Sequence, residues 1–561
     1  MRSESSYSSV AATLCTLLYI TVRFLPLLVR LCGIGIGKNI RSRTEQRREL
    51  LLSRAVAEEE ELNKKQKPSS SSSDEGWEKV EEQAARSQAE GDVRDKDWRG
   101  IVGFFHPFCN AGGGGERVLW AAIRATQKRW PRAVCVVYTG DHEVDKDAIL
   151  QRVEDRFNIH LHPPTVTFLY LSTRHYVLAS TWPHFTLLGQ SFGSLILAHD
   201  AFTLLVPDIF VDTMGYAFAL ALSKFYFPSI PTGAYVHYPT ISKDMLSSLS
   251  DTAMSEQEGA LRGVNAGTGH GLKGKLKRTY WILFARLYSW IGSCVDVVMT
   301  NSTWTQNHMQ QLWGPRPPTT RTHDSIILSY YLSIAFPPVA VEELEEQVEV
   351  SALSEQKRGP YLLYIAQFRP EKNHQLILKS FAQLLSTYPP TGSSRDKPKL
   401  ILIGSVRNPD DATRVYNLRL LAHELKVKES VEFICDATWT QILSWLRRAS
   451  IGINGMWNEH FGIGVVEYQA AGLISVVNDS GGPKLDIVVP IDGEKTGFHA
   501  STADEFAEGF RQALELSPEE TLAMRLRARR SAGRFTERVF ADKWVDQMEK
   551  LVGLQRVLGG R

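Results

Sequence analysis

Short apolar runs that alternate with helix-like stretches occur in two series along this chain, and this alternation constrains the fold most. The first series is IVGFFHP (101–107), AVCVVYTG (133–140), TVTFLYL (165–171), PDIFVDT (207–213) and PTGAYVHYP (231–239). The second is YLLYIAQ (361–367), KLILIG (399–404), VEFICD (431–436), ASIGING (449–455) and LISVVND (473–479). Strands separated by helices favour a parallel sheet with crossover helices. We therefore predict an α/β protein with two Rossmann-like domains that face a cleft.

The chain has 561 residues, too many for one hydrophobic core. The predicted parts are an N-terminal membrane anchor (1–37), a disordered linker with basic, acidic and serine-rich stretches (38–97), an N-terminal Rossmann-like domain (98–336) with a mobile insertion (250–278), a second linker (337–359), a C-terminal Rossmann-like domain (360–535) and a C-terminal helix (536–561).

The N-terminal segment has the composition of a membrane anchor. Residues 5–22 carry no charge, and the apolar character continues to Leu31, interrupted by Arg23 and Arg30. We favour a membrane span over residues 10–31; a secretory signal and an interfacial helix are the alternatives. The basic residues that follow at once are Lys38, Arg41, Arg43, Arg47, Arg48 and Arg54. This excess of positive charge predicts that everything after residue 38 is cytosolic.

Charge and cysteine content exclude several classes of function. The net charge of +2 provides no electrostatic field for nucleic acid. The six cysteines include no CxxC pair, which argues against a disulfide framework or a zinc site. Asp-x-Asp occurs only at 95–97 and 145–147, in linker and helical contexts, so we predict no metal.

Four consecutive glycines, Gly112–Gly115, follow the first strand of the first series and precede a helical run. Such a loop presents unobstructed N–H groups to a phosphate at a helix N-terminus, although by itself it could equally be a tight turn. It fits neither a Walker A loop nor the dinucleotide fingerprint. Two histidines, His106 and His237, lie at the carboxyl ends of strands, where ligands bind in such sheets.

Residues 459–467, EHFGIGVVE, place two glutamates seven residues apart between a buried strand and a helix. Gly462 and Gly464 lie at the expected helix start, Glu459 in the loop and Glu467 about one turn into the helix. Two such carboxylates can hold the hydroxyls of one polyol ligand, whereas an isolated pair of this spacing is usually solvated.

The second domain offers two further ligand loops. Its first strand runs into FRPEKNH, where Arg369 and Lys372 are two cations suited to a diphosphate. Its last strand precedes Ser480–Lys484, another glycine loop, which contains Gly481. Together these loops suit a nucleotide diphosphate and a sugar.

The pattern GQSFG (189–193) favours a competing function, and the segment after the polar insertion has two possible structures. GQSFG (189–193) matches a hydrolase nucleophile elbow, for which Asp212 and His237 could complete a triad. The residues before it resemble an amphipathic helix rather than a strand, so we disfavour a hydrolase. Residues 280–302 are predicted to form a buried helix followed by a strand that ends at Thr300, with a one-sided contact to a bilayer as the alternative.

Five segments carry a family resemblance: EHFGIGVVE, HPFCNAGGGGERVLW, GAYVHYPTIS, QFRPEKNH and NDSGGPKLDIV. They resemble the retaining family 4 glycosyltransferases of GT-B architecture. Within these, the chain is similar over about residues 98–555, polar insertions excluded, to the GDP-mannose-dependent α-1,2-mannosyltransferases of the asparagine-linked glycosylation pathway.

The resemblance implies transfer of two α-1,2-linked mannoses from GDP-mannose to a dolichyl-diphosphate oligosaccharide with three mannoses and two N-acetylglucosamines. It implies an endoplasmic reticulum membrane protein with a single N-terminal span and cytosolic catalytic domains, which contacts membrane lipid and other mannosyltransferases of the pathway. No cofactor is expected. Another sugar nucleotide or acceptor, or a non-catalytic scaffold for sister transferases, remains the alternative.

The resemblance also implies roles for single residues. Glu459 contacts the transferred mannose, Glu467 the ribose hydroxyls, and Lys372 the diphosphate as its bond breaks. His237 binds the sugar or its developing charge. The other expected substrate-binding residues are Gly113, Gly114, Gly115, Arg369, Gly462, Ile463, Gly481 and Lys484. Many relatives have an arginine five residues before the lysine, where this chain has Gln367; its own arginine, Arg369, lies three residues before Lys372.

Overall fold

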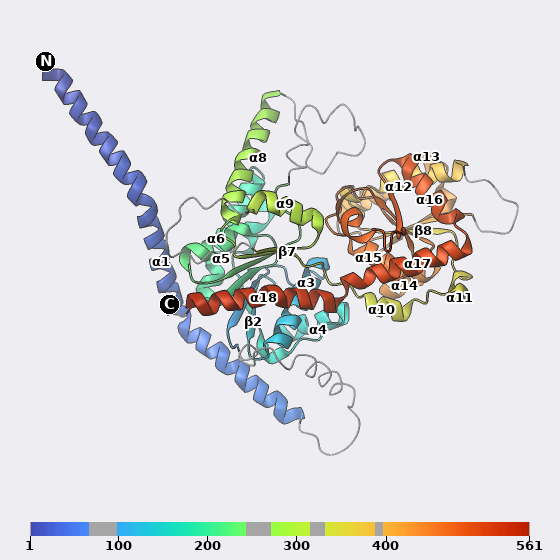
Figure 1. The fold of residues 1–561 in the computed structure, drawn as a ribbon, viewed down its shortest axis with the longest axis horizontal. Coiled ribbons are helices and arrows are strands. Elements are labelled where there is room, and N and C mark those ends of the chain that lie inside the picture. Colours follow the sequence, from blue (N-terminus) through green and yellow to red (C-terminus); the bar gives the residue numbers. More distant parts are fainter. Residues whose placement is uncertain (1, 67–97, 243–270, 315–330, 388–396, 560–561) are drawn as a thin grey trace.

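Two parallel sheets, one in each half of the chain, form the framework of the computed structural model. It describes residues 2–66, 98–242, 271–314, 331–387 and 397–559, and the side chains of these residues other than 2–23, 65–66 and 271–273. Figure 1 shows the two sheet domains side by side, joined by chain segments that include the long C-terminal helix. The two Rossmann-like domains predicted from the alternating runs are therefore present.

The first sheet has seven strands in the order β3-β2-β1-β4-β5-β6-β7, all parallel. The strands are β1 (Ile101–Phe105), β2 (Val134–Thr139), β3 (Val166–Tyr170), β4 (Ile209–Asp212), β5 (Thr232–Val236), β6 (Val297–Thr300) and β7 (Tyr331–Ile334). Successive β1 residues enter cores on opposite faces, as near-continuous apolar strands require.

Helices cover both faces of the first sheet. One face carries α3 (Gly114–Arg129), α4 (Lys146–Phe157) and α18 (Glu537–Gly559). The other carries α5 (Thr186–Leu204), α6 (Ala217–Tyr226), α8 (Gly271–Gly292) and α9 (Thr303–Trp313). The predicted helix and strand over 280–302 are α8 and β6 (Val297–Thr300), but α8 begins at Gly271, so the end of the expected mobile insertion (250–278) is helical. Residues 250–270 lie outside the described residues.

The second sheet has six parallel strands in the order β10-β9-β8-β11-β12-β13. They are β8 (Tyr361–Ile365), β9 (Lys399–Gly404), β10 (Val431–Cys435), β11 (Ile451–Asn454), β12 (Ile474–Asn478) and β13 (Gly497–Ala500). Its helices are α10 (Val341–Gln347), α11 (Ala352–Glu355), α12 (His374–Thr387), α13 (Pro409–Glu424), α14 (Trp439–Arg448), α15 (Ile463–Ala470), α16 (Ala503–Glu515) and α17 (Pro518–Ala532).

Two linker predictions need correction. The segment 337–359 is not an unstructured linker, because it forms α10 and α11 and buries Val341, Leu344 and Val348 in the core of the second domain. The segment 38–97, expected to be disordered, is helical up to Gln66, since α1 runs from Arg2 to Gln66. Residues 67–97 lie outside the described residues.

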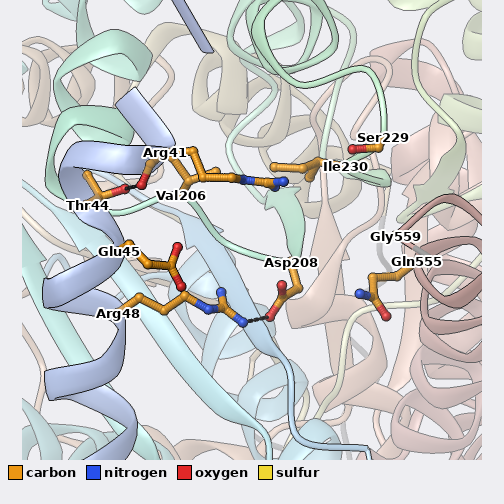
Figure 2. A pocket seen from close by; sticks show the side chains of 10 residues that line it. All are labelled: Arg41, Thr44, Glu45, Arg48, Val206, Asp208, Ser229, Ile230, Gln555 and Gly559. Atoms are coloured by element: carbon orange, nitrogen blue, oxygen red, sulfur yellow. Dashed lines mark hydrogen bonds and ion pairs between the residues drawn. The ribbon is translucent and has the colours of Figure 1, made fainter. Parts of the chain in front are cut away.

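The helix α1 lies against the first domain through its second half. Arg48 forms an ion pair with Asp208 (2.7 Å), and Ile40 and Ala55 are buried in the same core as β1. A cavity of about 240 Å³ remains between α1, the loops before β4 and β5, and the end of α18. Figure 2 shows the Arg48 side chain directed at Asp208 and the Arg41 side chain extending toward Ile230. It opens at the amino ends of the strands, whereas sheets of this class bind nucleotides at the carboxyl ends.

The predicted transmembrane anchor falls mostly on residues whose side chains are not described. Among the described residues, every helix is too short or too polar to cross a membrane. Between Phe24 and Leu31, α1 nevertheless exposes its apolar side chains, each about half accessible.

The C-terminal helix was predicted over 536–561, and α18 occupies most of that range. The helix α18 returns to the first domain, a placement that its sequence does not predict (Figure 1). Trp544 is fully buried there, stacks at 6.1 Å on Phe104, and donates its indole N–H to Thr126 Oγ1 at 3.0 Å. The last helix of the chain therefore completes the first domain.

Candidate active site

The two glutamates of EHFGIGVVE lie on one loop and one helix, as predicted. Glu459 is in the loop after β11, and Gly462 precedes α15 with φ of 105°, a left-handed conformation that favours glycine. Glu467 lies on the second turn of α15. A Cβ atom at Gly462 would lie 3.5 Å from Cγ of Glu459, so the helix start packs directly against this side chain.

Glu459 forms a largely buried ion pair with Lys372. Its Oε2 lies 2.6 Å from Lys372 Nζ and 3.4 Å from the side-chain amide of Asn454. Burial raises the pKa of Glu459, but the charge and hydrogen bond of Lys372 outweigh it, so the pKa lies below its ordinary value. An ionised carboxylate and an ammonium therefore lie side by side at the carboxyl ends of β8 and β11.

Glu467 has a different electrostatic environment. Burial raises its pKa to about 7, and the charge of Arg117 in the first domain lowers it only in part. Near neutral pH this carboxyl group is therefore divided between its protonated and ionised forms. The two glutamates share a motif, but only Glu459 is held in the charged state.

The second glycine loop supports the backbone of Glu459. Gly481 has φ of 64°, and a Cβ atom there would lie 2.3 Å from the carbonyl oxygen of Glu459. Gly482 donates its N–H to the same oxygen at 2.8 Å. Lys484, predicted to bind substrate, pairs with Asp479 at 2.9 Å, with both side chains well exposed. The loop thus positions Glu459 through its backbone.

The first glycine loop is held by a residue that sequence analysis missed. Gly113 donates its N–H to Glu116 in the first turn of α3, so the N–H groups of Gly114 and Gly115 are left as the better phosphate donors. Glu116 Oε1 lies 3.6 Å from Nε2 of the buried His106. An acidic residue three positions after a helix N-cap is the recognisable signal for such a contact.

The first glycine loop lies between the two domains. A Cβ atom at Gly115 would lie 3.6 Å from His237 Nε2, and one at Gly114 would lie 2.7 Å from Cδ1 of Ile463 in the second domain. A Cβ atom at Gly114 would therefore require the Ile463 side chain to move, whereas one at Gly115 would make ordinary van der Waals contact with His237. The structure thus brings together the predicted residues His237, Gly114, Gly115, Ile463 and Gly462.

His237 is a neutral imidazole in this setting. Its Nε2 lies 3.2 Å from the carbonyl oxygen of Thr213, which can only accept, so Nε2 carries the proton. Burial, aided by the nearby His106, lowers the pKa of His237 to about 4. Nδ1 therefore carries a lone pair that can accept a hydrogen bond from a hydroxyl group.

Arg369 precedes the short helical turn Pro370–Lys372, and its carbonyl oxygen accepts the N–H of Lys372 at 3.2 Å. Its guanidinium makes no hydrogen bond or ion pair within the described part of the chain. It lies beside Lys372 without sharing the contact to Glu459.

Two alternative motifs have structural explanations. GQSFG lies inside α5, where Ser191 donates its hydroxyl to the carbonyl of Leu187 at 2.7 Å, so it forms no strand–turn–helix elbow. Asp145, in the motif Asp145–Lys–Asp147, caps α4 by accepting the N–H of Ala148. Asp95 and Asp97 lie outside the described residues.

Solved structures with the same arrangement define the fold. The N-terminal domain of trehalose-6-phosphate phosphatase from Candida albicans matches with a TM-score of 0.57 at 14% identity, covering 83% of this chain and 99% of that one. The α,α-trehalose 6-phosphate synthase from Burkholderia multivorans matches with a TM-score of 0.56 at 12% identity, covering 81% and 99%. Two parallel Rossmann-like sheets with ligand loops at facing strand ends define the GT-B class.

Sequence comparisons are more specific. Residues 99–313 match the family model described as ALG11 mannosyltransferase N-terminus, and residues 346–531 match glycosyl transferases group 1. A Neurospora crassa protein named GDP-Man:Man(3)GlcNAc(2)-PP-Dol alpha-1,2-mannosyltransferase is 60% identical over 98% of both chains. The Mus musculus protein of the same name is 45% identical over 81% of this chain and 87% of its own length. This chain belongs to the family of GDP-Man:Man(3)GlcNAc(2)-PP-Dol alpha-1,2-mannosyltransferases.

Proposed function

We propose that this protein transfers α-1,2-linked mannoses from GDP-mannose to dolichyl-diphosphate-linked Man3GlcNAc2, adding two in sequence during assembly of the N-glycan precursor. The observation that carries the proposal is the 60% identity over 98% of both chains to the Neurospora crassa transferase. The positions of Glu459, Lys372 and the glycine loops at facing strand ends support it.

The proposed reaction retains configuration at the anomeric carbon. A hydroxyl oxygen of the acceptor mannose forms the new bond to that carbon, and the bond from the carbon to the β-phosphate oxygen of GDP breaks. The hydroxyl proton passes to the departing phosphate oxygen on the same face of the sugar, so GDP leaves carrying it. This route needs no protein base and no metal.

Lys372 and Glu459 provide the charges for that step. An ammonium has three N–H groups, of which one is directed at Glu459 and another approaches the sulfur of Met456. We assign the remaining donor to the diphosphate, where negative charge increases as the bond breaks. Glu459 accepts from hydroxyls of the transferred mannose and holds the Lys372 ammonium in place through their ion pair.

The nucleotide and the remaining loops follow from the same placement. Glu467 accepts from the ribose hydroxyls, and the N–H groups at Gly114 and Gly115 face the diphosphate, together with Gly462 and Ile463 across the cleft. Gly481 contributes by fixing Glu459. We assign Arg369 to the diphosphate as a second cation, and Lys484 to a peripheral position because of its pairing with Asp479.

Because His237 is neutral, it can orient a sugar hydroxyl but cannot supply a positive charge. With Nε2–H donated to Thr213, the ring offers Nδ1 as an acceptor and carries no positive charge. We therefore propose that it accepts a hydrogen bond from a sugar hydroxyl and so orients the sugar. This replaces the alternative in which it responds to charge in the transition state.

We propose that the protein works at the endoplasmic reticulum membrane, with an N-terminal span and cytosolic catalytic domains. Two exposed apolar surfaces support membrane contact. One is the run Phe24–Leu31 of α1, and the other is formed by α5 and α8, where Leu188 donates its N–H to Tyr280 Oη at 3.1 Å. The exposed large apolar residues on α5 and α8 are Leu188, Phe192, Leu276, Ile282, Leu283 and Trp290, and the segment before α5 adds Leu178 and Phe185.

Charge on α8 agrees with a lipid surface. The helix contains no acidic residue, and its basic side chains Lys275, Arg278 and Arg286 are exposed beside the apolar ones. Apolar area combined with basic charge favours binding at an anionic membrane interface. In Figure 1 the first half of α1 and the start of α8 extend from the same side of the first domain. A single bilayer could therefore contact both, together with sister mannosyltransferases at its surface.

The division of labour between the domains is also proposed. Residues 98–336 receive the acceptor and residues 360–535 bind the nucleotide sugar, while the helix over 536–561 belongs with the first domain. This division places His237 on the acceptor side of the cleft and Glu459, Glu467 and Lys372 on the donor side.

The test is transfer by the detergent-solubilised full chain. Radiolabelled GDP-mannose and a lipid-diphosphate Man3GlcNAc2 acceptor are incubated with EDTA, and the product is digested with an α-1,2-specific mannosidase. Two added mannoses, both released by the mannosidase, are expected. Transfer from UDP sugars but not from GDP-mannose would overturn the proposed donor, and a requirement for divalent metal would overturn the route without metal.

Glu459→Ala separates catalysis from scaffolding. It should abolish turnover while the protein still associates with sister transferases in co-purification. A variant with wild-type turnover would contradict the assignment of Glu459. A wild-type protein that associates but never transfers mannose would identify a scaffold.

A further inference from the structure

His460, the residue after Glu459, is part of a column of aromatic rings whose other members come from the first domain. Its ring lies 5.1 Å from that of Tyr238 with 16° between the planes, and 5.0 Å from that of Trp304 with 36° between them. Trp304 in turn contacts the ring of His308 at 4.1 Å. The imidazole of His460 therefore lies between an aromatic ring of the β5 loop and one of α9.

The neighbours of these rings belong to the proposed active site. Tyr238 directly follows His237, and His460 directly follows Glu459. A ring stack between residues 238 and 460 therefore sets the separation between the loop on the acceptor side and the carboxylate on the donor side. On each loop, the stacked residue is the immediate neighbour in sequence of the residue assigned to the sugar.

A polar contact beside the stack connects the same elements. Thr303, next to Trp304, donates its N–H at 2.9 Å and its hydroxyl to the carboxylate of Asp486 in the second domain. Asp486 is only 4% exposed, and its carboxylate also interacts electrostatically with the positive charge of Arg534. Because this contact fixes the start of α9 to the second domain, Trp304 has a defined position against which the ring of His460 can pack.

The contact made by His460 is one of ring packing rather than charge. Burial lowers the pKa of His460, and although Glu459 opposes this, the pKa stays below the ordinary value for histidine, so the ring is neutral at pH 7. Packed aromatic pairs contribute about 0.5–1.5 kcal/mol beyond the area they bury. A phenyl ring should therefore replace the imidazole, and a methyl group should not.

We propose that His460 is a positioning residue for the transfer reaction, holding the Glu459 carboxylate at its distance from His237 by stacking between Tyr238 and Trp304. Glu459 itself touches the sugar, whereas His460 acts through it. The inference rests on the proposed function, since it concerns the geometry of that same site. It predicts that loss of the ring slows the chemical step while nucleotide binding, which we assign to Glu467, Lys372 and the glycine loops, is maintained.

The experiment compares His460→Ala, His460→Phe and the matched control His423→Ala in the full-length protein. His423 is an exposed histidine on α13, away from the cleft. For each variant, kcat and KM for GDP-mannose and the acceptor are measured, and GDP affinity is measured by calorimetry. His460→Ala should lower kcat by about 10- to 100-fold, as expected for a displaced reacting group, with GDP affinity changed less than about threefold.

His460→Phe should recover kcat to within about threefold of wild type, and His423→Ala should match wild type. A wild-type kcat in His460→Ala, a His460→Phe variant as slow as His460→Ala, or a parallel loss of GDP binding would overturn the inference. Should His460→Ala fail to fold, Trp304→Ala removes the same contact from the other domain. Trp304→Ala should lower kcat by the same factor as is expected for His460→Ala. Combining it with a His460 variant that is already slow should lower kcat no further, because the two rings form one contact.

The activity of the wild-type protein separates failure of the proposed function from failure of the positioning role of His460. A wild-type enzyme that does not transfer mannose from GDP-mannose refutes the proposed function. A working wild-type enzyme whose turnover is insensitive to His460→Ala refutes only the positioning role.

Discussion

The pKa of Glu467 makes a quantitative prediction about nucleotide binding. Burial raises this pKa to about 7, with partial opposition from Arg117. Ribose hydroxyls donate hydrogen bonds best to an ionised carboxylate, which has acceptor oxygens only. If Glu467 holds the ribose, GDP must bind preferentially to the deprotonated enzyme.

The size of the effect follows from the titration of one group. With a pKa of about 7, roughly 9% of the carboxyl is ionised at pH 6 and roughly 91% at pH 8. GDP affinity should therefore rise about tenfold between pH 6 and pH 8, which corresponds to about 1.4 kcal/mol.

The unliganded enzyme should respond to pH in the opposite sense. The folded pKa of Glu467 lies above its ordinary value of 4.5, so the folded state holds this proton more tightly than the unfolded chain. Stability is therefore lost as pH rises from about 4.5 to about 7, by up to roughly 3 kcal/mol. Bound GDP, by favouring the ionised form, should reduce this loss.

Calorimetric titration with GDP at pH 6, 7 and 8 tests the prediction in wild type and Glu467→Gln. The glutamine variant cannot ionise, so its remaining pH dependence reports titration of the GDP phosphate, whose last pKa is about 6. Subtracting that dependence should leave the tenfold change in wild type. Equal pH dependence in both proteins would refute the assignment of Glu467 to the ribose or its raised pKa.

Three further predictions concern the supports of the site and the fold. Gly481→Ala places a Cβ atom 2.3 Å from the carbonyl oxygen of Glu459 and should lower kcat more than about tenfold, whereas Gly493→Ala, equally left-handed but with open space around it, should retain turnover in the same transfer assay. Arg525→Met removes the buried guanidinium that Glu355 and the carbonyls of Ser450 and Gly472 accept from, and should lower the free energy of unfolding by about 3–5 kcal/mol. Arg530→Met, whose partner Asp492 is exposed, should lower it by less than about 1 kcal/mol. Urea denaturation measures both values, and equal effects would contradict the prediction. Trp544→Ala should destabilise the first domain by about 3–5 kcal/mol in the same assay, and a loss confined to the second domain would show that α18 does not belong to the first.

Local sequence patterns predicted the parts of the fold that depend on local chemistry. Buried parallel strands have apolar runs, so ten of the thirteen strands in the described part of the chain were recognised in the two series and an eleventh, β6, within the segment 280–302. Glycines at strand ends marked the loops at Gly112–Gly115, Gly462 and Gly481 for the same reason, since close backbone approach excludes side chains. The remaining strands, β7 and β13, have four residues each, and neither has an uninterrupted apolar run.

What the sequence could not predict depends on which elements meet in space. Nothing in the residues of α18 indicates that it packs on the first sheet, because an amphipathic helix can cover either domain. The composition of the charged segment that continues α1 predicts disorder, yet this segment forms two ion pairs with the first domain, Arg48 with Asp208 and Glu58 with Lys146. Tertiary ion pairs of this kind leave no local periodic signal.

For the same reason, only some of the residues of the candidate site could be predicted from the sequence. Glu459, Glu467 and Lys372 follow from motif spacing within one domain, but Glu116, His460 and Asp486 matter through partners on other elements, and for His460 and Asp486 those partners lie in the other domain. A cleft formed by two separately folded sheets derives its stability within each sheet and its geometry from the few contacts between them. Substitutions within a sheet core should therefore change the free energy of unfolding, as argued for Trp544 and Arg525. Substitutions at the contacts between the domains should change kcat with little effect on unfolding, so measuring both quantities on each variant separates residues that build the domains from residues that align them.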